Sequence, residues 1–308
     1  MLEHKIILDA DPGIDDAVAF AVLLGSCKEQ MKMIITTYGN IPNDKATRNT
    51  LSLLTLLGAD DIPVVRGLQQ PGEGNAIYED ASYIHGGDGI GGLQETPLFK
   101  NMQVKEAIEG DALQIIYDAI IEAGSVIYIT LGPLTNLAAL MKRFPDVTDH
   151  IHQVVTMGGG IGLGNVTEFA EFNFYCDAES AGYVMAHAPK LLLAPIDVTT
   201  QVALSMEQIT AIGQSNTPVA KAMEAMLTVN YDQCVSYGEP GATMHDSTAI
   251  LAFLHPDLFT FKQCGITLDC EREKYGQSTV AEGSKIRLMI GADHARLLEL
   301  IAESIASF

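Results

Sequence analysis

Short apolar runs alternate with longer amphipathic stretches along most of the chain. The runs typical of buried strands fall at residues 5–8, 33–37, 62–65, 126–130, 154–157 and 191–194. The patterns typical of helices fall at residues 17–24, 43–57, 112–122, 135–141 and 221–237. Because the two kinds alternate, we predict an α/β fold with an open, mostly parallel central sheet flanked by helices on both faces. In such sheets, ligands bind beyond the carboxyl ends of the strands.

The remaining stretches are less regular. Residues 67–100 form the longest segment without clear periodicity and are rich in glycine and acidic side chains. A loop of that length in a compact domain is usually functional or disordered. Strand-like runs lie within residues 259–290, and residues 292–305 predict a closing helix. Since no internal repeat or Pro/Ser-rich linker divides the chain, we predict a single domain over residues 1–308.

The charge balance is strongly acidic. The chain has 18 Lys and Arg against 39 Asp and Glu, which gives a net charge of −21. Such a field repels nucleic-acid backbones and anionic membranes, so we expect no nucleic acid and no membrane as a partner. It is compatible with cations and neutral polar molecules, although most of the acidic surplus is expected on solvated faces.

Cysteine usage and hydropathy point to the cytoplasm. The five cysteines are scattered and form no C-x-x-C pair, which is typical neither of a disulfide framework nor of a zinc finger. No signal-peptide pattern is present, and no apolar run reaches the roughly 18 residues that span a bilayer. We therefore expect a cytoplasmic protein.

A crowded acidic run follows the first predicted strand. Four carboxylates occur within eight residues: Asp9, Asp11, Asp15 and Asp16. Like charges this close repel one another, and no Lys or Arg lies between Lys5 and Lys28 to offset them. A hard cation such as Ca²⁺ or Mg²⁺ is the simplest counter-charge. The alternative is an N-cap with helix-dipole acids and no metal.

Polar groups also follow the other predicted strands. Asn40 comes after the second strand, and the Gly132-Pro133 turn frees the Leu131 carbonyl to face a ligand. After the glycines at residues 158–160, the segment 170–173 alternates apolar and polar residues, which places Glu171 and Asn173 on one side if the segment is extended. With Asn165, these groups suit the hydroxyls of a sugar. Ordinary turns and satisfied polar loops remain the alternative at each position.

The last cluster is His245-Asp246, at the start of an apolar helix. Asp246 is either a helix cap or a further metal ligand, and His245 is a candidate general acid or base contact. Gln233 and Tyr237 lie four residues apart and share a face of the preceding helix. The sequence contains no Ser-His-Asp order and no P-loop that would indicate a different chemistry. The pattern of acids, amides and histidines favours activation of water by a carboxylate and a metal.

Together these segments resemble the inosine-uridine nucleoside hydrolase family. Residues 9–16 match its D-x-D-P-G-x-D-D hallmark without a gap, and the match continues in order to about residue 255 through Gly39-Asn40, residues 132–136, Met157, Asn165, residues 170–173 and His245-Asp246. The resemblance implies the Rossmann-like fold of that family, a ribonucleoside substrate and a tightly held Ca²⁺. It also implies a homodimer or homotetramer.

The resemblance assigns a role to each matching residue. The calcium ligands would be Asp11, Asp16, the Leu131 carbonyl and Asp246. A Ca²⁺-bound water would be activated by Asp11 as general base and oriented by Asn40, with Asp9 supporting the other acids. Substrate contacts would come from Asp15 and Asn173 at the 2′- and 3′-hydroxyls, from Met157, Asn165 and Glu171 around the 5′-hydroxyl, and from His85 and His245 near the leaving base.

Two further features concern the preferred base and a departure from the family's sequence pattern. The spacing of Gln233, Tyr237 and His245 looks like that of pyrimidine-preferring members, so we predict hydrolysis of uridine and cytidine to free base and ribose. The chain has no Trp, which excludes a tryptophan-stacked purine site. Ser247 stands where the family often has Pro, at what we take as the first helical position, and should cost little. The alternatives are a calcium-dependent nucleoside-binding protein without turnover and a metal-dependent phosphohydrolase.

Overall fold

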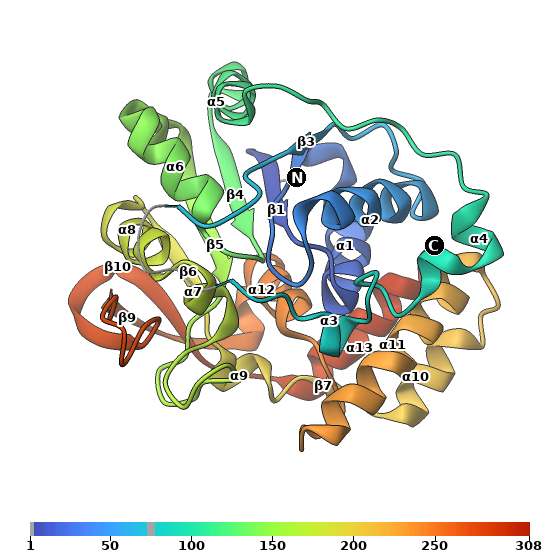
Figure 1. The fold of residues 1–308 in the computed structure, drawn as a ribbon. Coiled ribbons are helices and arrows are strands. Elements are labelled where there is room, and N and C mark those ends of the chain that lie inside the picture. Colours follow the sequence, from blue (N-terminus) through green and yellow to red (C-terminus); the bar gives the residue numbers. More distant parts are fainter. Residues whose placement is uncertain (1–2, 73–77) are drawn as a thin grey trace.

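One twisted sheet organises the computed structural model, which describes residues 3–72 and 78–308 (Figure 1). In this described part, eight strands pair in the order β3-β2-β1-β4-β5-β6-β10-β9. All neighbouring pairs are parallel except β9 with β10. The bounds are β1 Lys5–Ala10, β2 Met31–Thr36, β3 Val64–Arg66, β4 Val126–Thr130, β5 Ile151–Met157, β6 Leu191–Ala194, β9 Phe259–Leu268 and β10 Ser278–Ala292, with β7 Ala203–Leu204 and β8 Ala242–Thr243 as a separate small pair.

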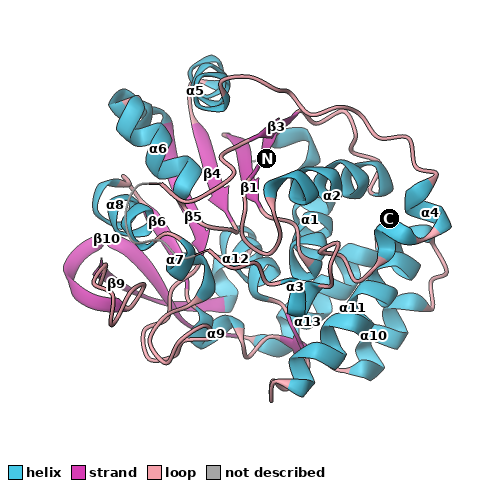
Figure 2. Ribbon diagram, in the orientation of Figure 1, coloured by secondary structure: helices cyan, strands magenta, loops and turns pink. Residues whose placement is uncertain are grey.

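Helices cover both faces of this sheet (Figure 2). Their bounds are α1 Ile14–Cys27, α2 Asn43–Leu56, α3 Ser82–His85, α4 Pro97–Lys100, α5 Ala112–Ala123, α6 Thr135–Arg143, α7 Phe172–Cys176, α8 Ala178–His187, α9 Ile196–Thr199, α10 Met206–Gly213, α11 Pro218–Ser236, α12 His245–Leu254 and α13 His294–Ala306. On β1, Ile6 and Leu8 join the apolar cluster that α1, α11, α12 and α13 complete, whereas Ile7 joins the cluster of α5, α6 and α8. The predicted α/β fold is therefore confirmed.

The predicted start of the first helix was wrong, and the condition that residues 170–173 are extended is not met. Helix α1 begins at Ile14 rather than residue 17, because the Asp16 carboxylate accepts the Gly13 N–H at 2.9 Å and caps the helix. The segment 170–173 is not an extended strand, since Glu171 caps α7 and the helix begins at Phe172. In a hydrophobicity pattern, an acidic residue at the start of a helix cannot be distinguished from a loop residue, which explains both differences.

The segment without periodicity carries the short helices α3 and α4, and its residues 73–77 lie outside the described part. Its later portion is attached to the strand ends by hydrogen bonds. The Ala81 N–H donates to the Asn40 carbonyl at 2.9 Å. The Asn49 amide donates to the Pro12 and Asp88 carbonyls at 3.1 and 2.8 Å. This loop therefore passes over the acidic run.

Within residues 3–72 and 78–308, no helix combines the length with the apolar character that crossing a bilayer requires.

Candidate functional site

A cavity of about 390 Å³ opens at the carboxyl ends of the parallel strands. Its floor comes from the loops that follow β1, β2, β4 and β5, and from the start of α12. Its roof comes from α3, from the loop before α7 and from the end of α11. Among the predicted site residues, the lining includes Asp15, Asn40, His85, Leu131, Met157, Asn165, Glu171, Asn173, Tyr237, His245 and Asp246.

Asp11, like Asp16, is almost fully buried and is not among the residues that line the cavity. Its Oδ2 accepts the Asn40 N–H at 2.7 Å, while Oδ1 has no hydrogen-bond partner among the described residues. Two glycines make room for the carboxylate: a Cβ built on Gly39 would lie 1.9 Å from Asp11 Oδ2, and one on Gly132 would lie 2.4 Å from Oδ1. The loops after β2 and β4 thus hold this carboxylate between them.

Three further carboxylates converge beside Asp11. Ligand oxygens of Asp15, Asp16 and Asp246 all lie within 4.8 Å of one another, and all three side chains are buried. Asp16 Oδ2 accepts the Gly13 N–H at 2.9 Å and the Asn40 amide at 3.0 Å. Asp246 does not cap α12, whose N-cap is Met244. The capping interpretation of Asp246 was therefore wrong.

Burial and mutual repulsion disturb the protonation of this cluster. Burial, followed by the charge of Asp16, raises the pKa of Asp15 to about 7. Burial and then the charges of its three neighbours raise the pKa of Asp246 well above its usual range. The pKa of Asp11 rises for the same reasons. Groups that are this costly to ionise together need a nearby positive charge to stay ionised at neutral pH.

The donor set fits a hard divalent cation. The buried oxygens Asp11 Oδ1 and Asp16 Oδ1 have no hydrogen-bond partner in the described structure. Carboxylate and carbonyl oxygens are the ligands that Ca²⁺ and Mg²⁺ prefer. The tight group includes Asp15, which we had predicted as a ribose contact. Asp11 stands next to it, within the electrostatic reach of Asp16 and Asp15.

Glu171 and Asn173 form one side of the cavity. The Glu171 carboxylate accepts the N–H groups of Gly159 at 2.7 Å and Asn173 at 2.9 Å. The Asn173 amide donates to the Leu131 carbonyl at 2.7 Å and to the Met157 carbonyl at 3.3 Å. Both side chains reach the cavity although the segment is a helix start. The Leu131 carbonyl thus accepts a hydrogen bond from a side chain that lines the cavity, and its role as a metal ligand stays a prediction.

Asn165 and Asp9 have supporting positions. The Asn165 side chain is at the exposed edge of the cavity, where its Oδ1 accepts the Phe172 N–H at 2.9 Å. Asp9 lies beneath the floor, fully buried, and accepts the Tyr128 hydroxyl at 2.8 Å and the Asn136 amide at 3.0 Å. Burial raises the pKa of Asp9 to about 7.

Two histidines line the cavity, His85 on α3 at the roof and His245 at the start of α12. His85 Nδ1 accepts the Ile14 N–H at 3.1 Å, which places the ring proton of a neutral His85 on Nε2. Burial lowers the pKa of His85 to about 3, with a smaller contribution from the charge of His245. Burial also lowers the pKa of His245 to about 4, and its Nδ1 lies 2.8 Å from the Thr199 hydroxyl. Both imidazoles are neutral at pH 7.

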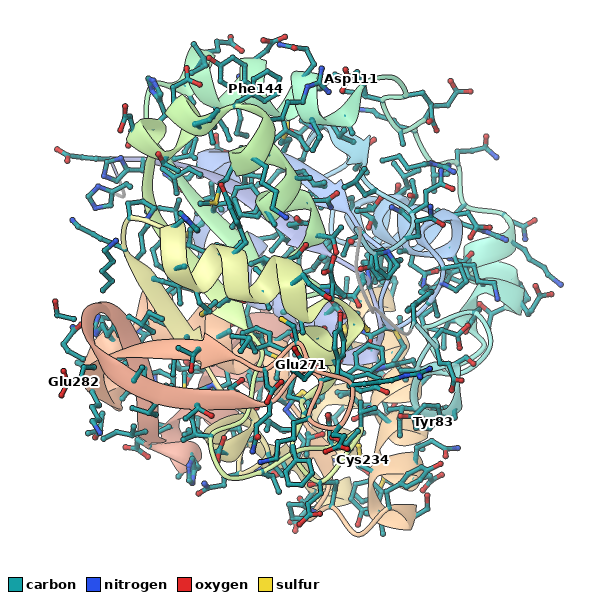
Figure 3. The ribbon with its side chains drawn as sticks, turned by 60° about the vertical axis from the view of Figure 1, so that its left-hand side comes forward. Tyr83, Asp111, Phe144, Cys234, Glu271 and Glu282 are labelled. Atoms are coloured by element: carbon teal, nitrogen blue, oxygen red, sulfur yellow. The ribbon has the colours of Figure 1, made fainter. Side chains whose placement is uncertain are left out.

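Helix α11 presents a different face to the cavity than the sequence suggested. Asn230, Cys234 and Tyr237 line the cavity, whereas Gln233 does not. Positions i, i+4 and i+7 share a helical face, so the sequence could predict which residues lie together. It could not predict which face of the helix is turned to the cavity. Tyr237 meets Tyr83 of α3 edge-on, with ring centroids 5.8 Å apart. Figure 3 shows Tyr83 and Cys234 on the same lower side of the molecule, far from Asp111 and Phe144.

Several lining residues were not anticipated from the sequence. They are Ala81, Tyr83, Ile84, Leu163, Gly164, Phe172, Ile196, Asn230, Cys234, Glu239 and Thr243. Most are apolar or ordinary loop residues, and nothing in their local pattern distinguishes them from core or solvent positions. Ser247 is the third residue of α12 rather than the first, and its buried hydroxyl lacks a partner in the described part of the chain.

Comparisons with known proteins agree with this geometry. The model of the family described as inosine-uridine preferring nucleoside hydrolase matches residues 6–299. A pyrimidine-specific ribonucleoside hydrolase, RihA, of Shewanella woodyi is 33% identical, over 100% of this chain and 99% of that protein. A non-specific ribonucleoside hydrolase, RihC, of Salmonella schwarzengrund is 33% identical, over 90% of this chain and 87% of that protein. The solved purine-preferring ribonucleoside hydrolase from Gardnerella vaginalis superimposes with a TM-score of 0.89 at 26% identity, over 98% of both chains.

Proposed function

The chain belongs to the inosine-uridine preferring nucleoside hydrolase family, and on this basis we propose that it hydrolyses the N-glycosidic bond of ribonucleosides to free base and ribose. We propose pyrimidine ribonucleosides, uridine and cytidine, as the preferred substrates. The observation that carries the proposal is the buried group of Asp15, Asp16 and Asp246, two of which line a nucleoside-sized cavity, with Asp11 beside the group.

Calcium is the proposed cofactor. Asp11, Asp16, Asp246 and the Leu131 carbonyl would hold it, with Asp15 beside them. When bound, it supplies the positive charge that keeps the carboxylates ionised and that attracts the sugar hydroxyls and the attacking water. The unpaired oxygens Asp11 Oδ1 and Asp16 Oδ1 support this assignment.

The floor supplies the base and the electrostatic stabilisation. Asp11 takes a proton from the attacking water, and Asn40, which donates to both Asp11 and Asp16, holds the two carboxylates in place. Cleavage of an N-glycosidic bond develops positive charge on the ribose. Asp15 and Asn173 hold the ribose hydroxyls, and the negative floor stabilises that charge more in the transition state than in the substrate.

The roof receives the leaving base. Met157, Asn165 and Glu171 surround the 5′-hydroxyl. His85 and His245 are neutral at pH 7 and lie at the base end, where an Nε2–H of His85 donates a hydrogen bond to the departing base as negative charge develops. Tyr237 offers the base an aromatic surface, and the RihA relative is named as pyrimidine-specific. These points support the pyrimidine preference.

A reducing-sugar assay over the common ribonucleosides, with and without added CaCl₂ and after exhaustive metal removal, tests the proposal. We expect ribose release from uridine and cytidine without phosphate. Absence of ribose from every nucleoside, together with calcium-dependent nucleoside binding by calorimetry, would indicate the binding protein instead. A phosphohydrolase is disfavoured because no Lys or Arg is among the described residues that line the cavity.

Two properties of the whole protein are also proposed. The five cysteines are free, and four of them are buried, which supports a reducing cytoplasmic location. We propose a homodimer or homotetramer on family grounds, which light scattering after gel filtration tests.

A further inference from the structure

We propose that Glu239 determines base selectivity by accepting a hydrogen bond from an exocyclic amino group of the substrate base, so that cytidine is preferred over uridine. The inference rests on the proposed function, because it concerns the base end of the same cavity. It names an amino-bearing base, cytosine or adenine, as the substrate class over the corresponding keto base.

Glu239 is a carboxylate at the roof end of the cavity whose side chain has no partner among residues 3–72 and 78–308. It lies in the loop between α11 and β8 and lines the cavity. No hydrogen bond or ion pair to its side chain is present in the described structure, and no described Lys or Arg lines the cavity. Burial raises the pKa of its carboxyl. A partly buried acceptor with no donor of its own favours a ligand that brings one.

Asn230 provides a second unsatisfied group at the base end. Its side chain is only 2% exposed and lines the cavity, yet its one hydrogen bond within the described residues is a 3.6 Å contact from the Cys234 thiol to Oδ1. The amide N–H groups of Asn230 are therefore free to donate to a ligand. Cys234 follows one turn later on α11 and also lines the cavity.

Asn230 and Glu239 lie at different depths of the cavity. Asn230 is almost fully buried, whereas Glu239 follows the end of α11 and is partly exposed, so a base that contacts both presents a different edge atom to each. A ring carbonyl next to the glycosidic bond, present in both cytosine and uracil, suits the Asn230 donor. The group at the far edge is an amino donor in cytosine and a carbonyl in uracil. A carboxylate accepts from the first and is repelled by the lone pairs of the second.

The two residues therefore have separable effects. Asn230 faces an atom that both pyrimidines share, so its replacement changes both substrates alike. Glu239 faces the atom in which they differ, so its replacement changes their ratio. Adenosine and inosine also differ by an amino group against a carbonyl. We therefore expect Glu239 to favour adenosine over inosine, as it favours cytidine over uridine.

The experiment compares kcat/KM for cytidine and uridine in the calcium-loaded wild type and in Glu239→Gln. We expect the wild type to prefer cytidine and the cytidine-to-uridine ratio to fall about tenfold in Glu239→Gln, since the amide both donates and accepts. Glu239→Asp should recover part of the ratio. Asp232→Asn is the matched control, because Asp232 is exposed on the opposite face of α11 and should leave the ratio unchanged.

The outcomes separate this inference from the proposed function. Dissociation constants for the two nucleosides are also measured by calorimetry in Asp11→Asn, with and without Glu239→Gln, so that the ratio is obtained even without turnover. A ratio that stays within twofold in both measurements, with unchanged melting temperature, overturns the role of Glu239. Asn230→Leu should weaken both pyrimidines by the same factor, and a selective loss of cytidine there would assign the selectivity to Asn230 instead.

Discussion

The floor and the roof of the cavity are built in different ways. On the floor, Asp11 and Asp16 are buried and accept hydrogen bonds from neighbouring groups of the protein, and even Asp15, which lines the cavity, is only 6% exposed. On the roof, Tyr83 and Tyr237 are 52% and 63% exposed and contact each other through their rings. Hydrogen bonds within the protein therefore fix the carboxylates assigned to chemistry, whereas the two tyrosines at the roof contact each other only through their rings in the described structure.

The difference has its origin in the sheet. Asp9 of β1 pairs with Thr130 of β4, and Ala10 of β1 pairs with Thr36 of β2, so Asp11 and Leu131 follow their strands at neighbouring positions. The register of a parallel sheet leaves these groups no freedom to separate. Helices α3 and α11 have no such register. We therefore expect substitutions on the floor to abolish activity. Substitutions on the roof should preserve activity but alter the base selectivity.

The largest effect is expected from Asp11→Asn. The variant removes the proposed base while the Asn40 N–H keeps an oxygen acceptor, so kcat should fall about 10³-fold with the fold retained. Loss of one like charge from the cluster should also raise the melting temperature of the metal-free protein. The reducing-sugar assay and a thermal melt measure both. A variant with more than a tenth of wild-type kcat would contradict the role of Asp11.

Removal of the metal should act on the floor alone. We expect activity to fall about 10²-fold and nucleoside binding to weaken, since several kcal/mol of charge stabilisation are lost. Restoration by CaCl₂ in preference to ZnCl₂, followed by metal analysis, checks the identity of the ion. Full activity in rigorously metal-free protein would contradict the proposed cofactor.

The metal-free protein should also show a defined pH dependence. Asp9 and Asp15 have a pKa of about 7 when folded, against about 3.9 in an unfolded chain. Protons therefore bind the folded state more tightly, and the stability that they add is complete below pH ~4 and lost as the pH rises through about 7. Melting temperature should fall from pH 5 to pH 8 without metal, and CaCl₂ should raise it most at pH 8. A metal-free melting temperature that rises over this range would contradict the assignment.

A smaller effect is expected on the roof. Tyr237→Ala should raise KM about tenfold with kcat nearly unchanged, because it removes an aromatic surface at the cavity. Gln233→Ala is the matched control on the same helix and should change KM less than about twofold, since polar surface substitutions cost little. A larger effect at Gln233 than at Tyr237 would reverse our view of which face of α11 meets the base.

The smallest effect is expected from Ser247→Ala. The Ser247 hydroxyl is buried beside the floor and has no hydrogen-bond partner among the described residues. Its removal should relieve a desolvation cost of about 1 kcal/mol and raise the melting temperature by about 2 °C. A fall in melting temperature would show that the hydroxyl is satisfied in solution.

The sequence by itself determined the fold class and the content of the floor. Apolar runs separated by helical patterns require a parallel sheet with both faces covered, and such a sheet brings every strand end to one edge. The acids of residues 9–16 and Leu131 could therefore be predicted as neighbours, whereas Asp246 follows a strand outside this sheet and was placed with them only by the family resemblance. The start of α1 and the form of residues 170–173 could not, because polar capping residues have no periodic signature.

Only the tertiary structure decided the roof. The rotation of α11 brings Asn230 and Cys234, rather than Gln233, to the cavity, and the fold places Glu239 and Tyr83 beside them. Helix rotation is set by the sum of many weak side-chain contacts across the core, which local spacing does not encode. Strand-end positions follow from backbone hydrogen bonding, which is the same for every parallel sheet, whereas the roof depends on packing that is particular to this chain.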